Sequence, residues 1–275
     1  MSDTITSNGV DLGETILKCK EVAASPAAIT GTGQLYTKST NRIYFRDGDG
    51  TENVIYYADI NYAEMYMNAN ATPMAIETAS TPVMTRLWTT GMVNGWTFAA
   101  GSTGAITAYA DGSGTYGANT IIVTDAGHGL VTGDIISIRG TAAPNDYNGV
   151  YSITRIDNDT FWITKAGWNE DAGASDWDQG SYFKAGSGAA GLYTQLYSIT
   201  VAGTSGDTIT FQIYINATPC TKCRCQRKFP NGDVGEMSGS SLITIAAGDR
   251  LSVVATSDDN NDITISYGNV ALHRI

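Results

Sequence analysis

Thr208-Ile-Thr-Phe-Gln-Ile-Tyr-Ile215 is the clearest part of the stretch that decides the fold, residues 191–275. Every second residue of this octapeptide is strongly apolar, which is typical of a β-strand that buries one face. Strand-like runs also lie at 84–98, 182–184, 191–201, 221–228, 241–246, 250–256, 262–267 and 269–275. Together they predict a two-sheet sandwich of roughly eight to ten strands.

The composition agrees with an all-β chain. Of the 275 residues, 31 are glycine and only 16% are charged, against about 25% in an average domain. Many turns and Thr/Ser/Asn-rich strands fit these values. The chain is long enough to bury a sizeable core without disulfides or metals. Its length allows one large β domain or two to three smaller ones.

Charge and hydropathy argue against two classes of partner. The net charge of −11 disfavours general nucleic-acid binding, which needs Lys and Arg to neutralise phosphates. Because no apolar run approaches about 20 residues, we expect no membrane insertion. Residues 1–7 are polar and lack the basic and apolar regions of a signal peptide, so we expect synthesis in a cytoplasm without export by the general secretory route.

The residues most often used for metal binding are few. They are Cys19, Cys220, Cys223, Cys225, His128 and His273. The last three cysteines form Cys-x-x-Cys-x-Cys, whereas a zinc site commonly uses two separated pairs. A disulfide between Cys223 and Cys225 is disfavoured, because their Cα atoms would lie about 7 Å apart on a strand. We therefore expect reduced thiols, no metal and no cofactor.

A catalytic site is not expected either. His128 stands between two glycines, and no Ser, Cys or carboxylate partner lies at a recognisable spacing from it. A histidine in a turn is therefore favoured over a catalytic one, and we predict that the protein is not an enzyme.

The N-terminal third is predicted to form an arm and a meander. Residues 1–34 are rich in Ser, Thr, Ala and Gly, and we expect a partner surface or the protein's own oligomer to order them. Residues 35–82 are predicted to be a β-meander followed by a connector that holds one strand at 63–67. The Asp-Gly steps at 47–50 mark a turn. A calcium loop would need more oxygen ligands than Asp47, Asp49 and Glu52 supply.

Part of the meander is similar to a phrase near the N-terminus of bacteriophage fibre and decoration proteins. The matching residues are Gly33, Leu35, Tyr36, Lys38, Ser39, Ile43, Tyr44, Phe45, Asp47, Gly48, Asp49, Gly50, Thr51 and Glu52. The resemblance implies that residues 1–57 attach the chain to capsid or tail proteins.

A small β-barrel is predicted as an insertion at 103–170. Five short strands follow one another there at regular spacing, separated by Gly, Asp and Asn turns. The phrases at 127–134, 147–149 and 159–161 resemble a small barrel domain of phage structural proteins. Residues 83–102 are then the first strands of the sandwich, and residues 171–275 are the remainder.

Three aromatic residues near the end of this insertion are candidate glycan contacts. Trp168, Trp177 and Tyr182 lie among Asp, Gly and Ser residues, and exposed rings in such loops can stack on sugars. The alternative, which we prefer, is that these rings cover the joint between barrel and sandwich.

The phrases at 189–193, 211–216, 242–249 and 263–275 resemble the jelly roll of the complement-component/tumour-necrosis-factor superfamily. This chain has Asn216-Ala217 where Asn-Gly is usual in the family, and its Cys-rich strand at 220–225 is atypical. The resemblance implies a homotrimer whose Tyr- and Leu-lined sheet faces are buried around a threefold axis. Since tyrosine is enriched at interfaces, the candidate interface residues are Tyr193, Tyr197, Tyr214, Tyr267 and the C-terminal Ile275.

These patterns predict an all-β structural protein with an N-terminal arm and β-meander, a small inserted β-barrel and a C-terminal jelly-roll β-sandwich. We expect a trimeric capsid decoration, cement or head-fibre protein on the outer surface of a phage virion, made in the host cytoplasm. A tail fibre or tail-tip receptor-binding protein and a stand-alone carbohydrate-binding adhesin are the alternatives. The expected partners are further copies of the chain, phage capsid or tail proteins bound through residues 1–57 and, in the alternatives, host surface glycans.

Overall fold

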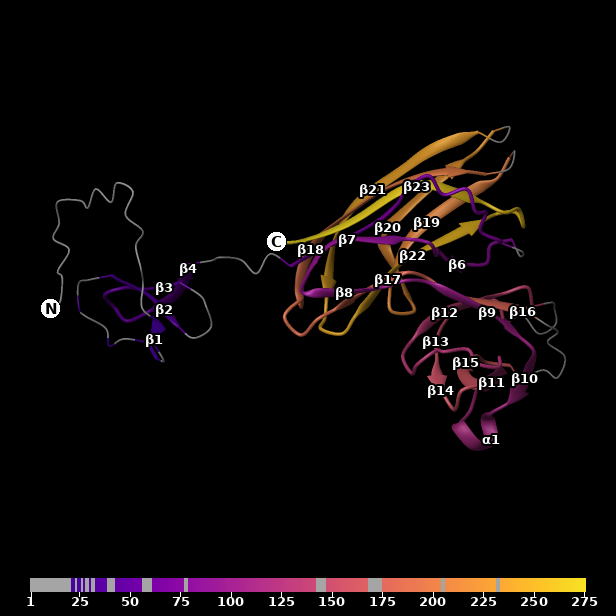
Figure 1. The fold of residues 1–275 in the computed structure, drawn as a ribbon, viewed down its shortest axis with the longest axis horizontal. Coiled ribbons are helices and arrows are strands. Elements are labelled where there is room, and N and C mark those ends of the chain that lie inside the picture. The colour runs from indigo at the N-terminus through magenta and orange to yellow at the C-terminus, as the bar shows by residue number, and fades with distance from the viewer. Residues whose placement is uncertain are drawn as a thin grey trace. The chain divides into compact units, whose positions relative to one another are not determined.

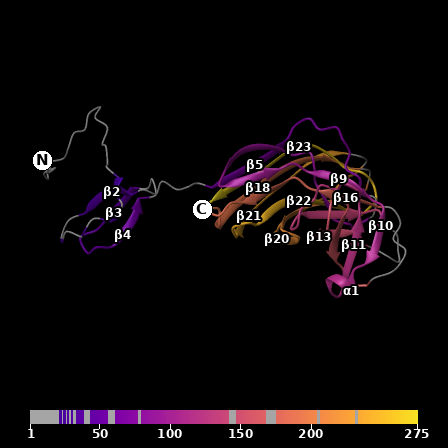
Figure 2. The same ribbon diagram turned by 60° about the horizontal axis from the view of Figure 1, so that its bottom comes forward.

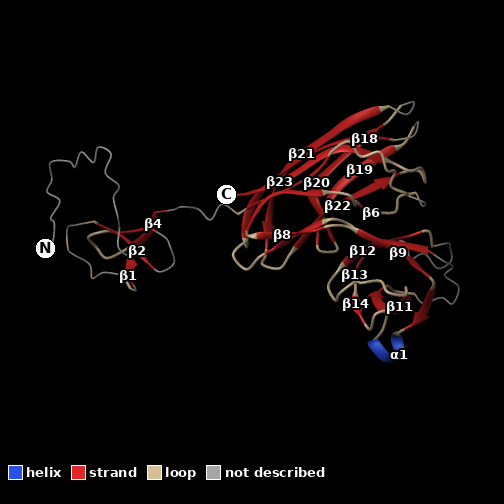
Figure 3. Ribbon diagram, viewed as in Figure 1, coloured by secondary structure: helices blue, strands red, loops and turns tan. Residues whose placement is uncertain are grey.

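The computed structural model describes residues 21–22, 24–25, 27, 30, 33–38, 43–55, 61–76, 79–141, 147–167, 175–203, 206–230 and 233–275. Strands dominate these ranges, and the one helix within them, α1 (Ser113–Tyr116), has four residues (Figures 1 and 3). The predicted all-β fold is confirmed. No helix of the described residues is long and apolar enough to cross a membrane. Residues 1–20 of the predicted arm, including Cys19, lie outside the described residues.

The chain divides into two compact units, and the smaller one, residues 1–59, contains the meander. Its sheet has four strands in sequence order: β1 (Glu21–Val22), β2 (Gln34–Lys38), β3 (Ile43–Arg46) and β4 (Glu52–Ile55). Between β3 and β4, the Asp47 carboxylate accepts hydrogen bonds from the N–H groups of Asp49 (3.1 Å) and Thr51 (2.8 Å). The carboxylate therefore closes the turn that the Asp-Gly steps predict.

The larger unit, residues 60–275, contains a sandwich of two antiparallel sheets, whose layers are visible in Figure 2. One sheet has the order β20-β19-β22-β17-β8, and β6 also pairs with β22. Its strands are β6 (Val83–Met84), β8 (Trp96–Ala99), β17 (Tyr182–Ala185), β19 (Thr208–Ile215), β20 (Thr218–Lys228) and β22 (Arg250–Ser257).

The facing sheet has five strands in the order β21-β18-β23-β5-β7. They are β5 (Tyr62–Met67), β7 (Thr89–Asn94), β18 (Gly191–Ala202), β21 (Val234–Ile245) and β23 (Thr264–Arg274). Successive side chains of a strand point to opposite faces, so the core receives every second residue. In β18 these are Tyr193, Gln195, Tyr197, Ile199 and Val201, all buried between the sheets.

The sandwich begins earlier than the predicted boundary at residue 83. β5 lies between β23 and β7 and buries Ala63, Met65 and Met67, so it is a core strand and not part of a connector. The predicted strands 262–267 and 269–275 also form one strand, β23, which runs through Gly268 without a break. A glycine is needed there because a Cβ atom would lie 2.6 Å from the Trp88 indole. The glycine makes room for that ring within the strand.

The small barrel is inserted between β8 and β17. These strands pair with Ala99 opposite Tyr182, so the chain leaves and re-enters the sandwich at neighbouring points. The barrel extends past the predicted end at 170, because β16 pairs with both β9 and β12. Its two sheets have the orders β10-β11-β15-β14 and β13-β12-β16-β9 and enclose a separate core. The strands are β9 (Ser102–Ile106), β10 (Ala108–Asp111), β11 (Thr120–Thr124), β12 (Ile135–Arg139), β13 (Gly149–Ser152), β14 (Thr154–Arg155), β15 (Thr160–Thr164) and β16 (Ser175–Gln179).

A buried joint holds the barrel against the outer face of β22. Its apolar part is one cluster drawn from sandwich and barrel: Met84, Ile135, Tyr214 and Val254. Beside this cluster, the Arg250 guanidinium of β22 donates to the Asp134 carboxylate of the barrel at 2.5 Å. Most of β22 is therefore buried on both faces, unlike β18, whose outer face is open.

Candidate interaction surface

The outer face of the five-stranded sheet exposes apolar side chains at positions where a strand that faces water usually carries polar residues. On β18, Leu192 and Leu196 are each 43% exposed, and on β21 Leu242 is 52% exposed. We use the name outer-face cluster for these three leucines and three further exposed residues of the same sheet: Tyr66, Val234 and Tyr267.

Strand register brings the cluster onto one face. Directly opposed residues of antiparallel strands point to the same side. Leu242 lies opposite Thr194, which stands between the two cluster leucines of β18. Tyr267 lies opposite Thr200, and Tyr66 lies opposite Asn269, both outward positions. The cluster therefore spans four neighbouring strands: β21, β18, β23 and β5.

Few charges interrupt this surface. The outward residues of β18 are Leu, Thr, Leu, Ser, Thr and Ala. The carboxylates of Glu64 and Glu236, on the same face, accept hydrogen bonds from Asn269 (2.6 Å) and Ser198 (2.8 Å). A shallow hollow of about 360 Å³ lies beside Leu196 and the hydroxyls of Ser238 and Ser240. A contiguous apolar surface with few charges is typical of the centre of a protein–protein interface.

The C-terminus extends the same surface. The Ile275 N–H donates to the Leu192 carbonyl oxygen at 3.0 Å, and the Ile275 side chain is 71% exposed. Ile275 and Tyr267, two of the predicted interface residues, thus have side-chain area that a neighbouring chain could bury. Their role at an interface stays a prediction.

The other three predicted interface tyrosines lie elsewhere. Tyr193 and Tyr197 point into the sandwich core, and the Tyr193 hydroxyl donates to the Ala189 carbonyl at 2.7 Å. Tyr214 is buried at the joint with the barrel. Because one chain already covers these side chains, they have no area left for a second chain, and their assignment to an interface is corrected.

The register of β18 decides which of its apolar residues face the core and which face outward. The sequence Leu192-Tyr193-Thr-Gln-Leu196-Tyr197 carries an apolar residue on each face of the strand at both ends. Such a double pattern is the signal for a strand whose two faces are both covered. The larger tyrosines fill the core, and the leucines form the outer face.

The predicted glycan contacts do not form an aromatic platform. Trp177 is buried in the barrel core, where its Nε1–H donates to the Asp125 carboxylate at 2.6 Å. Tyr182 is half-buried beneath the Arg250 guanidinium, 4.9 Å from its ring centre, next to the joint. This position fits the alternative, in which Tyr182 covers the joint. Trp168 lies outside the described residues.

His128 has the surroundings of a turn residue. Its Nδ1 accepts a hydrogen bond from the Leu130 N–H at 2.9 Å, and its ring packs edge-on against Phe161. In the described ranges, no three His, Cys, Asp or Glu side chains are grouped so that they could hold a metal ion.

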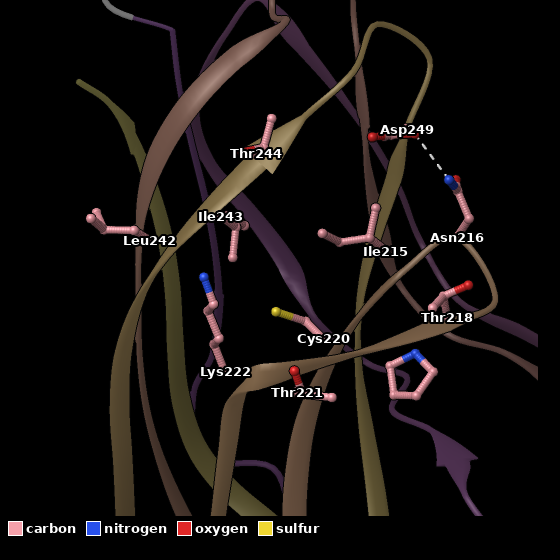
Figure 4. Close-up of a pocket in the computed structure, with 11 residues that line it drawn as sticks. Ile215, Asn216, Thr218, Cys220, Thr221, Lys222, Leu242, Ile243, Thr244 and Asp249 are labelled. Atoms are coloured by element: carbon pink, nitrogen blue, oxygen red, sulfur yellow. Dashed lines mark hydrogen bonds between the residues drawn. The ribbon is translucent and has the colours of Figure 1, made fainter.

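A second hollow, of about 480 Å³, opens between the sheet edges β20 and β21 (Figure 4). Cys220 and Lys222 line it from β20, and Ile243 lines it from β21. At one end, the Asn216 side chain donates to the Asp249 carboxylate at 2.9 Å. The hollow thus combines an apolar wall with one thiol and one ammonium group.

Comparison with known proteins assigns no family. The chain matches no protein-family model and no curated protein. Among solved structures, it is similar to a chain of the T13 infectious bursal disease virus particle, with a TM-score of 0.24 and 9% identity over 87% of this chain. It is also similar to a chain of the Gx strain of that virus, with a TM-score of 0.21 and 10% identity over 88% of this chain. A third similar structure is a GH31 α-xylosidase from Xanthomonas citri, with a TM-score of 0.16 and 7% identity over 93% of this chain.

The two viral chains are longer than this one, which spans 62% and 64% of their lengths; for the xylosidase the share is 34%. Similarities at these TM-scores carry no argument about function. The functional conclusion therefore depends on the residues and surfaces of this chain.

Proposed function

We propose that this chain is a non-enzymatic structural protein of a phage virion, which assembles as a homotrimer through the outer face of its five-stranded sheet. The observation that carries the proposal is the outer-face cluster. Its apolar side chains lie exposed on a sheet whose five strands all come from one chain, and no described residue of 60–275 covers them. Burying such surface against a copy of itself is favourable at about 25 cal/mol per Å² of apolar area.

The threefold arrangement is supported by the resemblance of the jelly roll to the complement-component/tumour-necrosis-factor superfamily. The strands that carry this resemblance include β18 and β23, which also carry Leu192, Leu196, Tyr267 and the adjacent Ile275. On this face the Glu236 and Glu64 carboxylates already accept hydrogen bonds from Ser198 and Asn269 within the chain.

Attachment to the virion is assigned to the N-terminal region. Residues 1–59 form a unit separate from the sandwich and contain the phrase that resembles phage fibre and decoration proteins. We favour a capsid decoration, cement or head-fibre protein, in which this unit binds the capsid and the sandwich projects outward. The competing placement is a tail fibre or tail-tip protein.

The mass of the protein in mild buffer tests the oligomer. We expect a species of three 29.1 kDa chains for the wild type and a monomer for the variant Leu192→Asp/Leu242→Asp, because carboxylates cannot be buried unpaired at the interface. The matched control is Val131→Asp, which replaces a residue that is 50% exposed on the barrel and should stay trimeric. A monomeric wild type, or a double variant that stays trimeric, contradicts the proposal.

Images of labelled virions test the placement. A label on the sandwich should decorate the capsid at many positions. Label at the tail tip alone contradicts the capsid placement and supports the tail fibre.

A further inference from the structure

The edge strand β20 contains a bulge that brings two cysteines together. Between the pairs Gln212↔Arg224 and Tyr214↔Pro219, the chain advances by two residues on β19 and by five on β20. The extra residues of β20 therefore leave the ladder. The Gln212 side-chain amide donates to the Cys220 carbonyl oxygen at 3.0 Å and holds the start of the bulge in place.

Within this bulge, the sulfur atoms of Cys220 and Cys223 are 2.8 Å apart. A disulfide bond is about 2.05 Å long, so the two sulfurs need to move by less than about 1 Å to bond. Bulges of this kind are local features that a regular strand lacks. In an unbroken strand, residues three apart point to opposite faces, which is why the Cys-x-x-Cys spacing alone does not predict the contact.

The two thiols have different access to solvent. Cys220 lines the hollow between β20 and β21 (Figure 4), whereas Cys223 is 2% exposed. The Cys223 sulfur also lies 2.7 Å from the Ser241 hydroxyl, which can donate a hydrogen bond to a thiolate. Lys222 lines the same hollow as Cys220 and brings a positive charge to it.

We propose that Cys220 and Cys223 are a redox-active dithiol, which closes to a disulfide by exchange with a small disulfide molecule such as oxidised glutathione. The Cys220 thiolate attacks one sulfur of the oxidant and releases one glutathione thiolate, which leaves a mixed disulfide on Cys220. Cys223 then loses its proton and attacks the Cys220 sulfur, which releases the second glutathione as a thiol. In total the chain loses two protons and two electrons, and the oxidant gains both and leaves as two glutathione thiols.

The order of the two attacks follows from burial. Burial, and next the hydrogen bond with Cys220, raise the pKa of the Cys223 thiol to about 12, so Cys223 is almost entirely protonated at neutral pH. Cys220 is the thiol that a molecule in the hollow can reach. Cys223 therefore acts second, when the sulfur that it attacks is already at contact distance.

Cys225 is the natural control because it belongs to the regular part of β20, opposite Phe211. Burial raises the pKa of the Cys225 thiol, and the hydrogen bond with Tyr197 acts in the opposite direction. We expect Cys225 to stay a thiol under conditions that oxidise the pair. Both cysteines belong to β20 of one chain, so the proposal does not require the trimer; Leu242, which lines the hollow, is the one residue that the hollow shares with the outer-face cluster.

Trypsin mapping of the folded protein tests the proposal. Cleavage after Lys18, Lys20, Lys222, Arg224 and Arg227 puts Cys19, Cys220, Cys223 and Cys225 on four different peptides. The reduced protein is equilibrated with oxidised and reduced glutathione, free thiols are alkylated, and the digest is analysed without reduction. We expect the peptide that ends at Lys222 to be linked to Cys223-Arg224, while Cys225 is alkylated.

Two variants provide the control. Cys225→Ser should form the same link at the same glutathione ratio, whereas Cys223→Ser should stop at a mixed disulfide between Cys220 and glutathione. A link through Cys225 in the wild type, or full alkylation of Cys220 and Cys223 in the presence of excess oxidised glutathione, overturns the proposal. Because the map is read on the wild-type chain, the result does not depend on whether a variant folds.

Discussion

At the level of single residues, the ion pair between Asp134 and Arg250 is sensitive to substitution. Both side chains are nearly buried, and their contact joins the barrel to the sandwich. In Asp134→Asn the guanidinium is left buried without a counter-charge, which typically costs about 3–5 kcal/mol. We therefore expect this variant to lower the free energy of unfolding by about 3 kcal/mol or more, measured by urea denaturation.

The matched control is Asp233→Asn, which breaks the exposed pair between Arg227 and Asp233, 3.5 Å apart. Exposed pairs contribute about 0–1 kcal/mol, so this variant should be close to the wild type. Adding Arg250→Met to Asp134→Asn should recover part of the lost stability, because it removes the unpaired charge. Equal stability of the two single variants would show that the joint does not depend on the pair.

The sequence predicts the burial of single side chains only in part. The alternation of apolar residues identifies the core positions of β18, but it does not show which face of the sheet is covered. Tyr193 and Trp177 are large aromatic residues in Gly- and Ser-rich surroundings, yet both are buried. Composition near a residue says little about its burial when the strands that pack against it are distant in sequence, as β11 is from Trp177 in the barrel core.

At the scale of elements, the turn before β15 makes a prediction about pH. The Asp157 carboxylate accepts hydrogen bonds from the N–H groups of Asp159 (2.9 Å) and Thr160 (2.7 Å) and from the Thr160 hydroxyl (2.8 Å). These bonds, first that of Asp159, lower the pKa of Asp157 below its ordinary value. A carboxyl whose pKa is lower in the folded state stabilises the fold above its unfolded pKa of about 3.9 and loses that contribution as the pH falls through the folded pKa.

We therefore expect stability to decrease as the pH falls below about 4, and to decrease less steeply in Asp157→Asn than in the wild type. The measurement is denaturant unfolding of both proteins at a series of pH values between neutral and strongly acid. Parallel curves for the two proteins would contradict the assignment. At neutral pH the two proteins should have equal free energies of unfolding only if the asparagine side chain of the variant accepts the same hydrogen bonds as the Asp157 carboxylate.

Elements also differ in how far the sequence specifies them. The Asp-Gly turn and the strands with clean alternation, such as β19, follow from local pattern alone. β5 does not, because its place between β23 and β7 depends on partners far away in the chain. The bulge in β20 is likewise set by the Tyr214↔Pro219 pairing, which no local spacing records. The Cys-x-x-Cys spacing alone therefore does not predict the contact between Cys220 and Cys223.

At the scale of the whole molecule, the two compact units predict separable roles. Among the described residues, all members of the three buried core clusters lie at or after Ala63. Removing residues 1–59 should therefore leave the sandwich and barrel folded, with a thermal unfolding transition close to that of the full chain. Since the outer-face cluster also lies within 60–275, the shortened chain should stay trimeric.

The same truncation should abolish binding to virions that lack the protein, because the proposed attachment region has been removed. The measurement is co-sedimentation of full-length and shortened protein with such particles, after both have been shown to be trimers by mass. A shortened chain that binds as well as the full chain would move attachment to the sandwich or the barrel. A shortened chain that becomes monomeric would show that residues 1–59 carry trimer contacts. In that case the full-length Leu192→Asp/Leu242→Asp variant should stay trimeric, whereas it should be monomeric if the outer-face cluster holds the trimer together.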